Sequence, residues 1–244
     1  MAKTLFDGIY RTLLEEIRSE QYPVGTLLPS ESELTRRFCC SRTTVRKALA
    51  LLASNGYTQS LVGKGVRVIW QPSQEGAFAP GSLESVNEFA RRIGKSVRTK
   101  AIAYERVVCD EALSERTQFD VGDELLYVSL VRYFDDKPAL LDDHYFLSSQ
   151  VPGLTKEVAE HSIFKYLEDV LHARIAVSKR TITVEKASKS DKAALEVRGT
   201  VFLACTYSLT YNSDGIMFEY VWGRYLPEYF CFHDVATRPL MGGW

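Results

Sequence analysis

The sequence predicts an α+β protein in two parts, a small helical domain over residues 1–70 and a larger domain built on an antiparallel sheet over residues 82–244. Helical periodicity in the first part and strand-like runs joined by hairpin turns in the second support this division. Between them, residues 71–81 hold two prolines and two glycines, a composition typical of an interdomain linker. A chain of 244 residues that is 45% hydrophobic and 25% charged suits two ordinary globular domains.

The two parts differ in charge. Residues 1–70 carry a net charge of +4 and residues 71–244 one of −5, within a total of −1. We therefore expect only the first domain to bind a polyanion. No apolar run approaches the ~20 residues that a membrane helix needs, and acidic residues near the start of the chain argue against a signal peptide.

The five cysteines follow neither a zinc-site spacing nor the disulfide framework of a secreted protein. We therefore expect a cytoplasmic protein that binds no membrane, no metal and no cofactor. The sequence leaves open whether the adjacent Cys39 and Cys40 are redox-active.

Capping residues and periodicity predict three helices in the first domain. Apolar residues at steps of four predict a helix over 4–20. Ser30, with Glu33 three residues later, forms a capping box that opens a second, short helix. Ser41 caps a third helix, which Asn55-Gly56 ends. Two short helices joined by a tight turn form a helix-turn-helix, whose second helix presents its N-terminal residues to the major groove of DNA.

A β-hairpin is predicted directly after the third helix. Strand-like runs over 57–62 and 66–70 flank Gly63-Lys64-Gly65, so the hairpin forms a wing beside the helix-turn-helix. The glycines have no side chain to hold the tip away from a groove, and Lys64 adds a positive charge. Backbone N–H groups and hydroxyls at a helix start suit phosphates, and arginines suit bases or phosphates. The candidate DNA-binding residues are Ser30, Ser41, Arg42, Thr43, Thr44, Arg46, Gly63, Lys64 and Gly65.

Three stretches of this region, residues 28–31, 41–49 and 63–65, closely resemble the winged helix of the GntR superfamily of bacterial transcription regulators. The resemblance implies that Arg42 and Arg46 read base pairs in double-stranded operator DNA. It also implies that hydroxyls at the start of the third helix contact phosphates and that a wing glycine lies in the minor groove. These hydroxyls belong to Ser41, Thr43 and Thr44.

The sequence departs from the family pattern at two places. The wing continues as Gly65-Val66-Arg67-Val68, where the family commonly has Gly-Thr-Phe-Val. Cys39 occupies a turn position that is often glycine, and a left-handed conformation there would strain the backbone by roughly 1 kcal/mol.

The second domain is predicted to consist of hairpins and a few helices. Turns at 135–138 and 212–215 join strand-like runs, which argues for an antiparallel sheet. Ser85, followed by Glu88, forms another capping box. The expected helices cover 85–92, 163–171 and 191–196, and the expected strands cover 98–108, 125–134, 139–147, 174–186, 201–211 and 216–226.

This domain resembles the effector-binding domain of the HutC subfamily of those regulators, the UTRA domain, which shares its fold with chorismate lyase. The order of the matching stretches along the chain carries the resemblance. They are residues 131–133, 137–142, 151–154, 162–167, 218–220 and 224–225. The resemblance implies a chorismate-lyase-like antiparallel-sheet domain that binds a small-molecule effector and holds the chain in a homodimer.

The same resemblance implies an effector site. In relatives that bind amino-sugar phosphates, an arginine matching Arg132 and a serine matching Ser162 hold the phosphate. A second helix start, matching Ser85 to Asn87, also suits the anion. Two carboxylates and a tyrosine hydroxyl take the hydroxyls or the amine of the sugar. The candidate effector-binding residues are Ser85, Asn87, Arg132, Asp142, Ser162, Phe164, Glu219 and Tyr225.

Three positions depart from that pattern and leave the ligand open. Leu130 stands where the family often has a second cation, Asp142 replaces a glutamate, and Phe164 replaces a tyrosine. A different or less anionic ligand is therefore an alternative. Arg132 and Asp142 also have a simpler interpretation, as an ion pair across a hairpin.

These features predict a ligand-responsive repressor that binds a palindromic operator as a dimer and is released by a phosphorylated sugar or amino sugar. An unphosphorylated sugar or a small carboxylate remains an alternative effector. We do not expect an enzyme, because the four histidines lie in no catalytic or metal motif, and the adjacent Asp142 and Asp143 point to opposite faces of a strand. An architectural DNA-binding protein without an effector is the third alternative.

Overall fold

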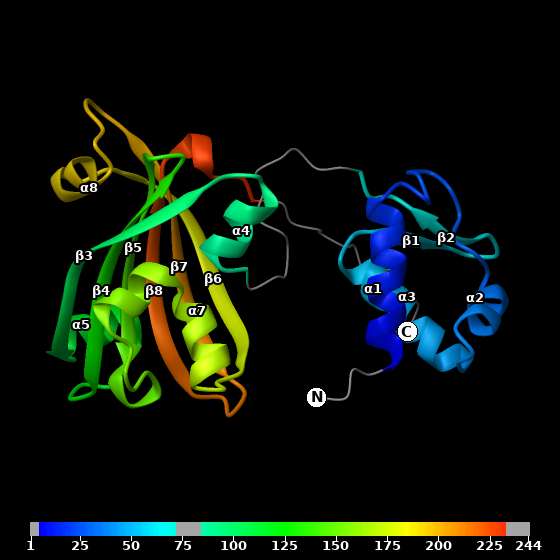
Figure 1. Cartoon of the computed structure of the whole chain (residues 1–244), viewed down its shortest axis with the longest axis horizontal. Coiled ribbons are helices and arrows are strands. Elements are labelled where there is room, and N and C mark those ends of the chain that lie inside the picture. Colours follow the sequence, from blue (N-terminus) through cyan, green and yellow to red (C-terminus); the bar gives the residue numbers. More distant parts are fainter. Residues whose placement is uncertain (1–4, 72–83, 233–244) are drawn as a thin grey trace, which may run out of the picture. The chain divides into compact units, whose positions relative to one another are not determined.

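The structure is a computed structural model that describes residues 5–71 and 84–232. These residues fall into two compact units, 5–71 and 84–231 (Figure 1). Apart from Gln71, the predicted linker lies outside the described residues.

The first unit contains three helices and a two-stranded hairpin. They are α1 (Leu5–Arg18), α2 (Glu31–Arg37), α3 (Arg42–Ser54), β1 (Thr58–Leu61) and β2 (Gly65–Val68). The apolar stripe predicted for α1 is confirmed at Ile9, Leu13 and Ile17, which are buried against the apolar face of α3, whereas Leu5 at its start is exposed. That face consists of Val45, Ala48, Leu49 and Leu52.

Local hydrogen bonds fix where α2 and α3 begin. The backbone N–H of Ser30 donates to Glu33 Oε2 at 2.7 Å, and the backbone N–H of Glu33 donates back to Ser30 Oγ at 3.3 Å, which confirms the predicted capping box. The hydroxyl of Ser41 accepts from the backbone N–H of Thr44 at 3.2 Å. Each cap satisfies N–H groups that the helix itself leaves unpaired and contributes about 1 kcal/mol.

The wing is reinforced by the segment that precedes α2. The N–H of Leu28 donates to the carbonyl of Val66 at 2.8 Å, and the N–H of Val68 donates to the carbonyl of Thr26 at 2.9 Å. Strand β2 therefore has a partner on both sides and is held at a fixed place beside α2. At the tip, Gly63 and Gly65 have φ values of 70° and 106°, which glycine adopts without strain.

The second unit is built on a six-stranded antiparallel sheet in the order β3-β4-β5-β8-β7-β6. This confirms the predicted sheet. Its strands are β3 (Val97–Val108), β4 (Glu124–Phe134), β5 (Lys137–Leu147), β6 (Ile175–Lys186), β7 (Phe202–Asn212) and β8 (Met217–Tyr225).

The helices of this unit are short. They are α4 (Val86–Arg92), α5 (Glu111–Thr117), α6 (Lys156–His161), α7 (Ile163–Lys165) and α8 (Lys189–Ala194), with a π-helical turn η2 (Tyr166–Val170) and 3-10 turns η1 (Ser148–Gln150) and η3 (Pro227–Tyr229). The sequence did not predict α5 or α6. The expected helix over 163–171 forms as α7 continued by η2, and the expected helix at 191–196 begins earlier because Ser188 caps it with Asp191.

The two faces of the sheet carry different partners. On the face that we call the inner face, Val128 and Leu130 of β4 and Phe146 of β5 pack against residues of α6, α7 and η2 (Figure 1). Those residues are Ala159, Ile163 and Leu167. On the opposite, outer face, Val131 and Leu141 pack with residues next to α8. Side chains two residues apart on a regular strand share a face, so Arg132, Asp142 and His144 also lie on the inner face.

We expect Cys39→Gly to raise the free energy of unfolding by about 0.5–1 kcal/mol, measured by urea denaturation of the full chain. Cys39 has a φ of 48°, the left-handed conformation in which its Cβ is strained. Cys39→Ala is the matched control, because it removes the thiol but keeps the strained Cβ. Equal effects of the two variants would contradict a backbone origin.

Candidate DNA interface and effector site

The start of α3 presents the predicted DNA-binding residues to solvent. Ser41, Arg42 and Thr43 are exposed, and Thr44 is half-buried with its hydroxyl 2.8 Å from that of Ser41. Arg42 forms no ion pair with any residue that the structure describes. The guanidinium of Arg42 and the first N–H groups of α3 can therefore approach a base edge or a phosphate without breaking an internal contact.

Arg46 lies one turn further along α3 and is already paired. Its Nε atom donates to Glu31 Oε1 and Oε2 of α2, at 3.0 Å and 2.9 Å, while 67% of the Arg46 side chain stays exposed. An exposed pair of this kind is worth at most about 1 kcal/mol. Glu31 therefore orients Arg46 without preventing it from turning to DNA.

The wing tip is open. Gly63, Lys64 and Gly65 are all exposed, and a Cβ added at either glycine would meet nothing within 4 Å. A groove edge can thus approach the tip backbone closely. Ser30, the remaining candidate in this unit, is exposed at the start of α2, with its hydroxyl bonded to Glu33 at 2.6 Å.

In the second unit, a buried arginine and a carboxylate meet on the inner face. Arg132 Nε donates to Asp142 Oδ2 at 2.8 Å, and its Nη1 donates to Thr99 Oγ1 at 3.2 Å. Neither side chain of the ion pair is more than 9% exposed. The pair predicted across the hairpin therefore forms. Leu130, on the same face, packs in the apolar core and supplies no second cation.

A histidine that the sequence analysis did not select joins this cluster. His144 Nδ1 lies 2.9 Å from Glu219 Oε1, and its Nε2 lies 3.9 Å from Asp142 Oδ2. Nε2 is buried and has no hydrogen-bond partner among the described residues. A buried polar atom left in this state costs about 1–3 kcal/mol. The sequence could have indicated this contact, because His144 is two residues from Asp142 on a predicted strand and therefore shares its face.

A glycine makes room for the rest of the cluster. A Cβ at Gly223 would lie 2.7 Å from Thr206 Oγ1, 3.0 Å from Tyr225 Cε2 and 3.1 Å from Asp142 Oδ1. Burial, and next the carboxylate of Asp142, raise the pKa of Tyr225, so its hydroxyl keeps its proton at neutral pH. The structure therefore brings four predicted residues together, namely Arg132, Asp142, Glu219 and Tyr225.

The other four candidates form a second group at helix starts. Ser85 caps α4 together with Glu88, Ser162 caps α7 by accepting from the N–H of Lys165, and Phe164 packs against the inner-face core. Asn87 Nδ2 donates to the carbonyl of His161 at 2.7 Å, which ties α4 to the end of α6.

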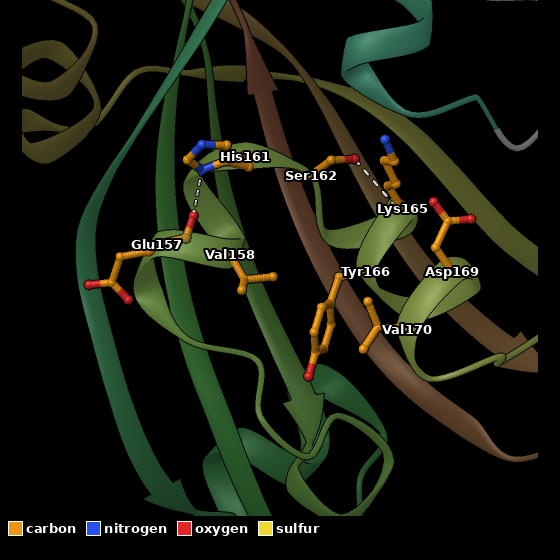
Figure 2. A pocket seen from close by; sticks show the side chains of 8 residues that line it. All are labelled: Glu157, Val158, His161, Ser162, Lys165, Tyr166, Asp169 and Val170. Atoms are coloured by element: carbon orange, nitrogen blue, oxygen red, sulfur yellow. Dashed lines mark hydrogen bonds between the residues drawn. The ribbon is translucent and has the colours of Figure 1, made fainter.

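Ser162 lines an open groove of about 390 Å³ formed by α6, α7 and η2. Figure 2 shows the side chains of Val158, Tyr166 and Val170 between Glu157 on one side and Asp169 on the other. Arg132 does not line this groove. The structure thus places the predicted serine and the predicted arginine in separate surroundings, and their joint role in binding a phosphate stays a prediction.

Asp143 confirms the expected alternation on β5. It pairs with Arg224 on the outer face, and Arg224 Nη1 also donates to Asp191 Oδ1 at 3.0 Å. Asp142 and Asp143 therefore do not form an acid–base pair. The described residues contain no cluster of metal-ligating side chains. Among them, no helix is long and apolar enough to cross a membrane.

The winged helix-turn-helix and the polar cluster of the sheet domain define a DNA-binding regulator with a ligand-binding domain. Comparison with known families agrees. The model for bacterial regulatory proteins of the gntR family matches residues 5–68, and the model for the UTRA domain matches residues 92–230. The chain belongs to the GntR family and carries a UTRA domain, and it is a transcription regulator rather than an enzyme.

Two curated relatives match nearly the whole chain. The transcriptional regulator TreR of Bacillus subtilis is 32% identical over 96% of this chain and 97% of its own length. The mannosyl-D-glycerate transport/metabolism repressor MngR of Escherichia coli is 27% identical over 97% of each chain.

Solved structures show the same fold. The possible transcriptional regulator YydK of Bacillus subtilis covers 96% of this chain and all of its own, with a TM-score of 0.78 and 23% identity. The effector-binding domain of the Bacillus subtilis trehalose repressor TreR covers 59% of this chain and 99% of its own, with a TM-score of 0.53 and 26% identity.

We expect Gly223→Ala to lower the free energy of unfolding by about 1–3 kcal/mol, because its Cβ would overlap the buried Thr206 hydroxyl. Adding Thr206→Ala should recover part of the loss. Gly8→Ala is the control, since a Cβ there meets nothing within 4 Å. Urea denaturation measures all three, and a neutral Gly223→Ala would refute the close packing described here.

Proposed function

We propose that this chain represses transcription as a homodimer on a palindromic operator and is released when a phosphorylated sugar or amino sugar binds its second domain. The observation that carries the proposal is the buried cluster of Arg132, Asp142, His144 and Glu219 on the inner face of the sheet. A site for a polyhydroxylated ligand needs several aimed donors and acceptors within an otherwise apolar surround, and this cluster supplies them next to the inner-face core.

The names of the relatives support a sugar-related effector. TreR is described as a trehalose repressor, MngR acts in a mannosyl-D-glycerate system, and further relatives are probable repressors of fructoselysine utilization. Each name refers to a sugar or a sugar conjugate. These ligands are those of the relatives. For this chain the names favour a chemical class of effector, sugars and sugar conjugates, and no particular compound.

One guanidinium nitrogen favours an anionic group on that sugar. Arg132 uses Nε for Asp142 and Nη1 for Thr99, and its Nη2 makes no hydrogen bond within the described part of the chain. Arginine presents its donors as a planar fork, so Nη2 can donate to a phosphate oxygen while the pair with Asp142 persists. Leu130 leaves this arginine without the help of a second cation, which limits how much negative charge the site tolerates.

Release from DNA follows from differential affinity. We propose that residues 1–70 bind the operator and that residues 82–244 bind the effector and form the dimer, in the cytoplasm where the operator is. A palindrome with two half-sites requires two recognition helices at a fixed spacing. An effector that binds more tightly to a state with another spacing shifts the population away from DNA.

We expect a phosphorylated sugar to raise the melting temperature of the full chain and to have no effect on Arg132→Ala. The panel contains glucose 6-phosphate, glucosamine 6-phosphate, trehalose 6-phosphate, the unphosphorylated sugars and small carboxylates. A ligand at 100 times its dissociation constant adds about 2.7 kcal/mol of stability. Arg98→Ala, which removes an exposed arginine of β3, is the control. A response to unphosphorylated compounds alone would refute the proposal that the effector is phosphorylated.

We expect Arg42→Ala to weaken operator binding by about 1–3 kcal/mol and to relax the preference for one base pair. The operator is first selected from a random duplex library, and binding is measured by fluorescence anisotropy at fixed salt against an unrelated duplex. Arg98→Ala should bind as the wild type does. If Arg42→Ala lost affinity equally for both duplexes, Arg42 would contact phosphate instead of a base.

A further inference from the structure

His144 holds a buried nitrogen that nothing in the described structure uses. Its side chain is 8% exposed, and its ring stacks on Phe146 with a centroid distance of 5.4 Å. Nδ1 is occupied by Glu219, but Nε2 has no hydrogen-bond partner among the described residues. Native structures rarely leave such an atom unpaired, so an unpaired one points to a missing partner.

The place of Nε2 in the sheet singles it out. The other buried side-chain atoms without a partner among the described residues lie in the DNA-binding unit, near η1 or on the outer face of the sheet. His144 alone among them shares the inner face with Arg132 and Asp142, two residues from Asp142 on β5. The unpaired nitrogen therefore lies inside the cluster to which we assign the effector.

The distance to Asp142 defines what fits. Nε2 of His144 lies 3.9 Å from Oδ2 of Asp142, too far for a direct hydrogen bond. For an oxygen atom at about 2.8 Å from both atoms, the angle at that oxygen between Nε2 and Oδ2 is about 90°. This is an acceptable geometry for two hydrogen bonds. A single hydroxyl oxygen can therefore form a hydrogen bond with each of the two atoms.

We propose that His144 and Asp142 together hold one hydroxyl of the sugar effector, which makes His144 a specificity-determining residue. The hydroxyl lies between Nε2 of His144 and Oδ2 of Asp142 and forms one hydrogen bond with each. Glu219 holds the ring through Nδ1, and Arg132 holds the carboxylate of Asp142, so both partners of the hydroxyl are fixed in place. The inference rests on the proposed sugar-binding function and deepens it.

The test pairs protein variants with ligand variants. Calorimetry measures binding of glucose 6-phosphate and its 1-, 2-, 3- and 4-deoxy analogues to the full-length wild type and to His144→Asn. The asparagine amide can replace Nδ1 as donor to Glu219 while Nε2 is removed. His172→Asn is the control, because His172 is exposed and has a φ of 52°, which asparagine tolerates.

We expect one deoxy analogue to bind the wild type about tenfold more weakly than glucose 6-phosphate, and that difference to vanish in His144→Asn. Asp142→Asn should abolish the difference at the same hydroxyl, and it carries the test if His144→Asn does not fold. His172→Asn should keep the wild-type pattern.

Two results would overturn the proposal, and they are distinguishable. If His144→Asn weakens all five ligands by the same factor, His144 supports the site without touching a hydroxyl, and the proposed sugar binding still stands. If the wild type binds none of the five, the assignment fails together with the proposed effector class.

Discussion

Strand β5 places two adjacent carboxylates on opposite faces of the sheet, and each is neutralised by an arginine of a neighbouring strand. Arg132 of β4 pairs with Asp142 on the inner face, and Arg224 of β8 pairs with Asp143 on the outer face. Removing one partner of a buried pair leaves an uncompensated charge, which is far more costly than losing an exposed pair. The register of β4, β5 and β8 is therefore fixed by charge as well as by apolar packing.

The inner face contains apolar residues that pack against the helices and polar residues that form the cluster. Leu130 and Phe146 bury apolar surface against the helices. Arg132, Asp142 and His144 lie beside them on the same face of the same two strands. Apolar burial supplies the stability that permits an incompletely satisfied polar cluster. In the site that we propose, a ligand hydroxyl that pairs with the buried Nε2 of His144 offsets the cost of leaving that nitrogen unpaired.

Local signals allowed the sequence to predict most of the fold. Ser30 with Glu33 defines the start of α2 through contacts three residues apart, and the turn residues of the hairpins define the sheet. The helices α5 and α6 were missed because seven and six residues are too few to display a helical period. His144 was missed because the family resemblance carries over only matching positions, and the pairing of His144 with Glu219 joins residues 75 apart in the chain.

The two buried arginines show why burial and charge alone do not identify a binding residue. Arg224 binds two aspartates, Asp143 and Asp191, through its Nη atoms and lies 3.9 Å from the centre of the Trp222 ring, while its buried Nε has no partner among the described residues. Arg132 binds one aspartate and one threonine and keeps Nη2 without a partner among the described residues. Within the part of the chain that the structure describes, both arginines therefore keep a nitrogen without a partner, and they differ in the carboxylates that they bind, two for Arg224 and one for Arg132. Two carboxylates repel a further anion more strongly than one does. This difference in charge supports the inner face, rather than the outer, as the side of the sheet that we propose for the effector.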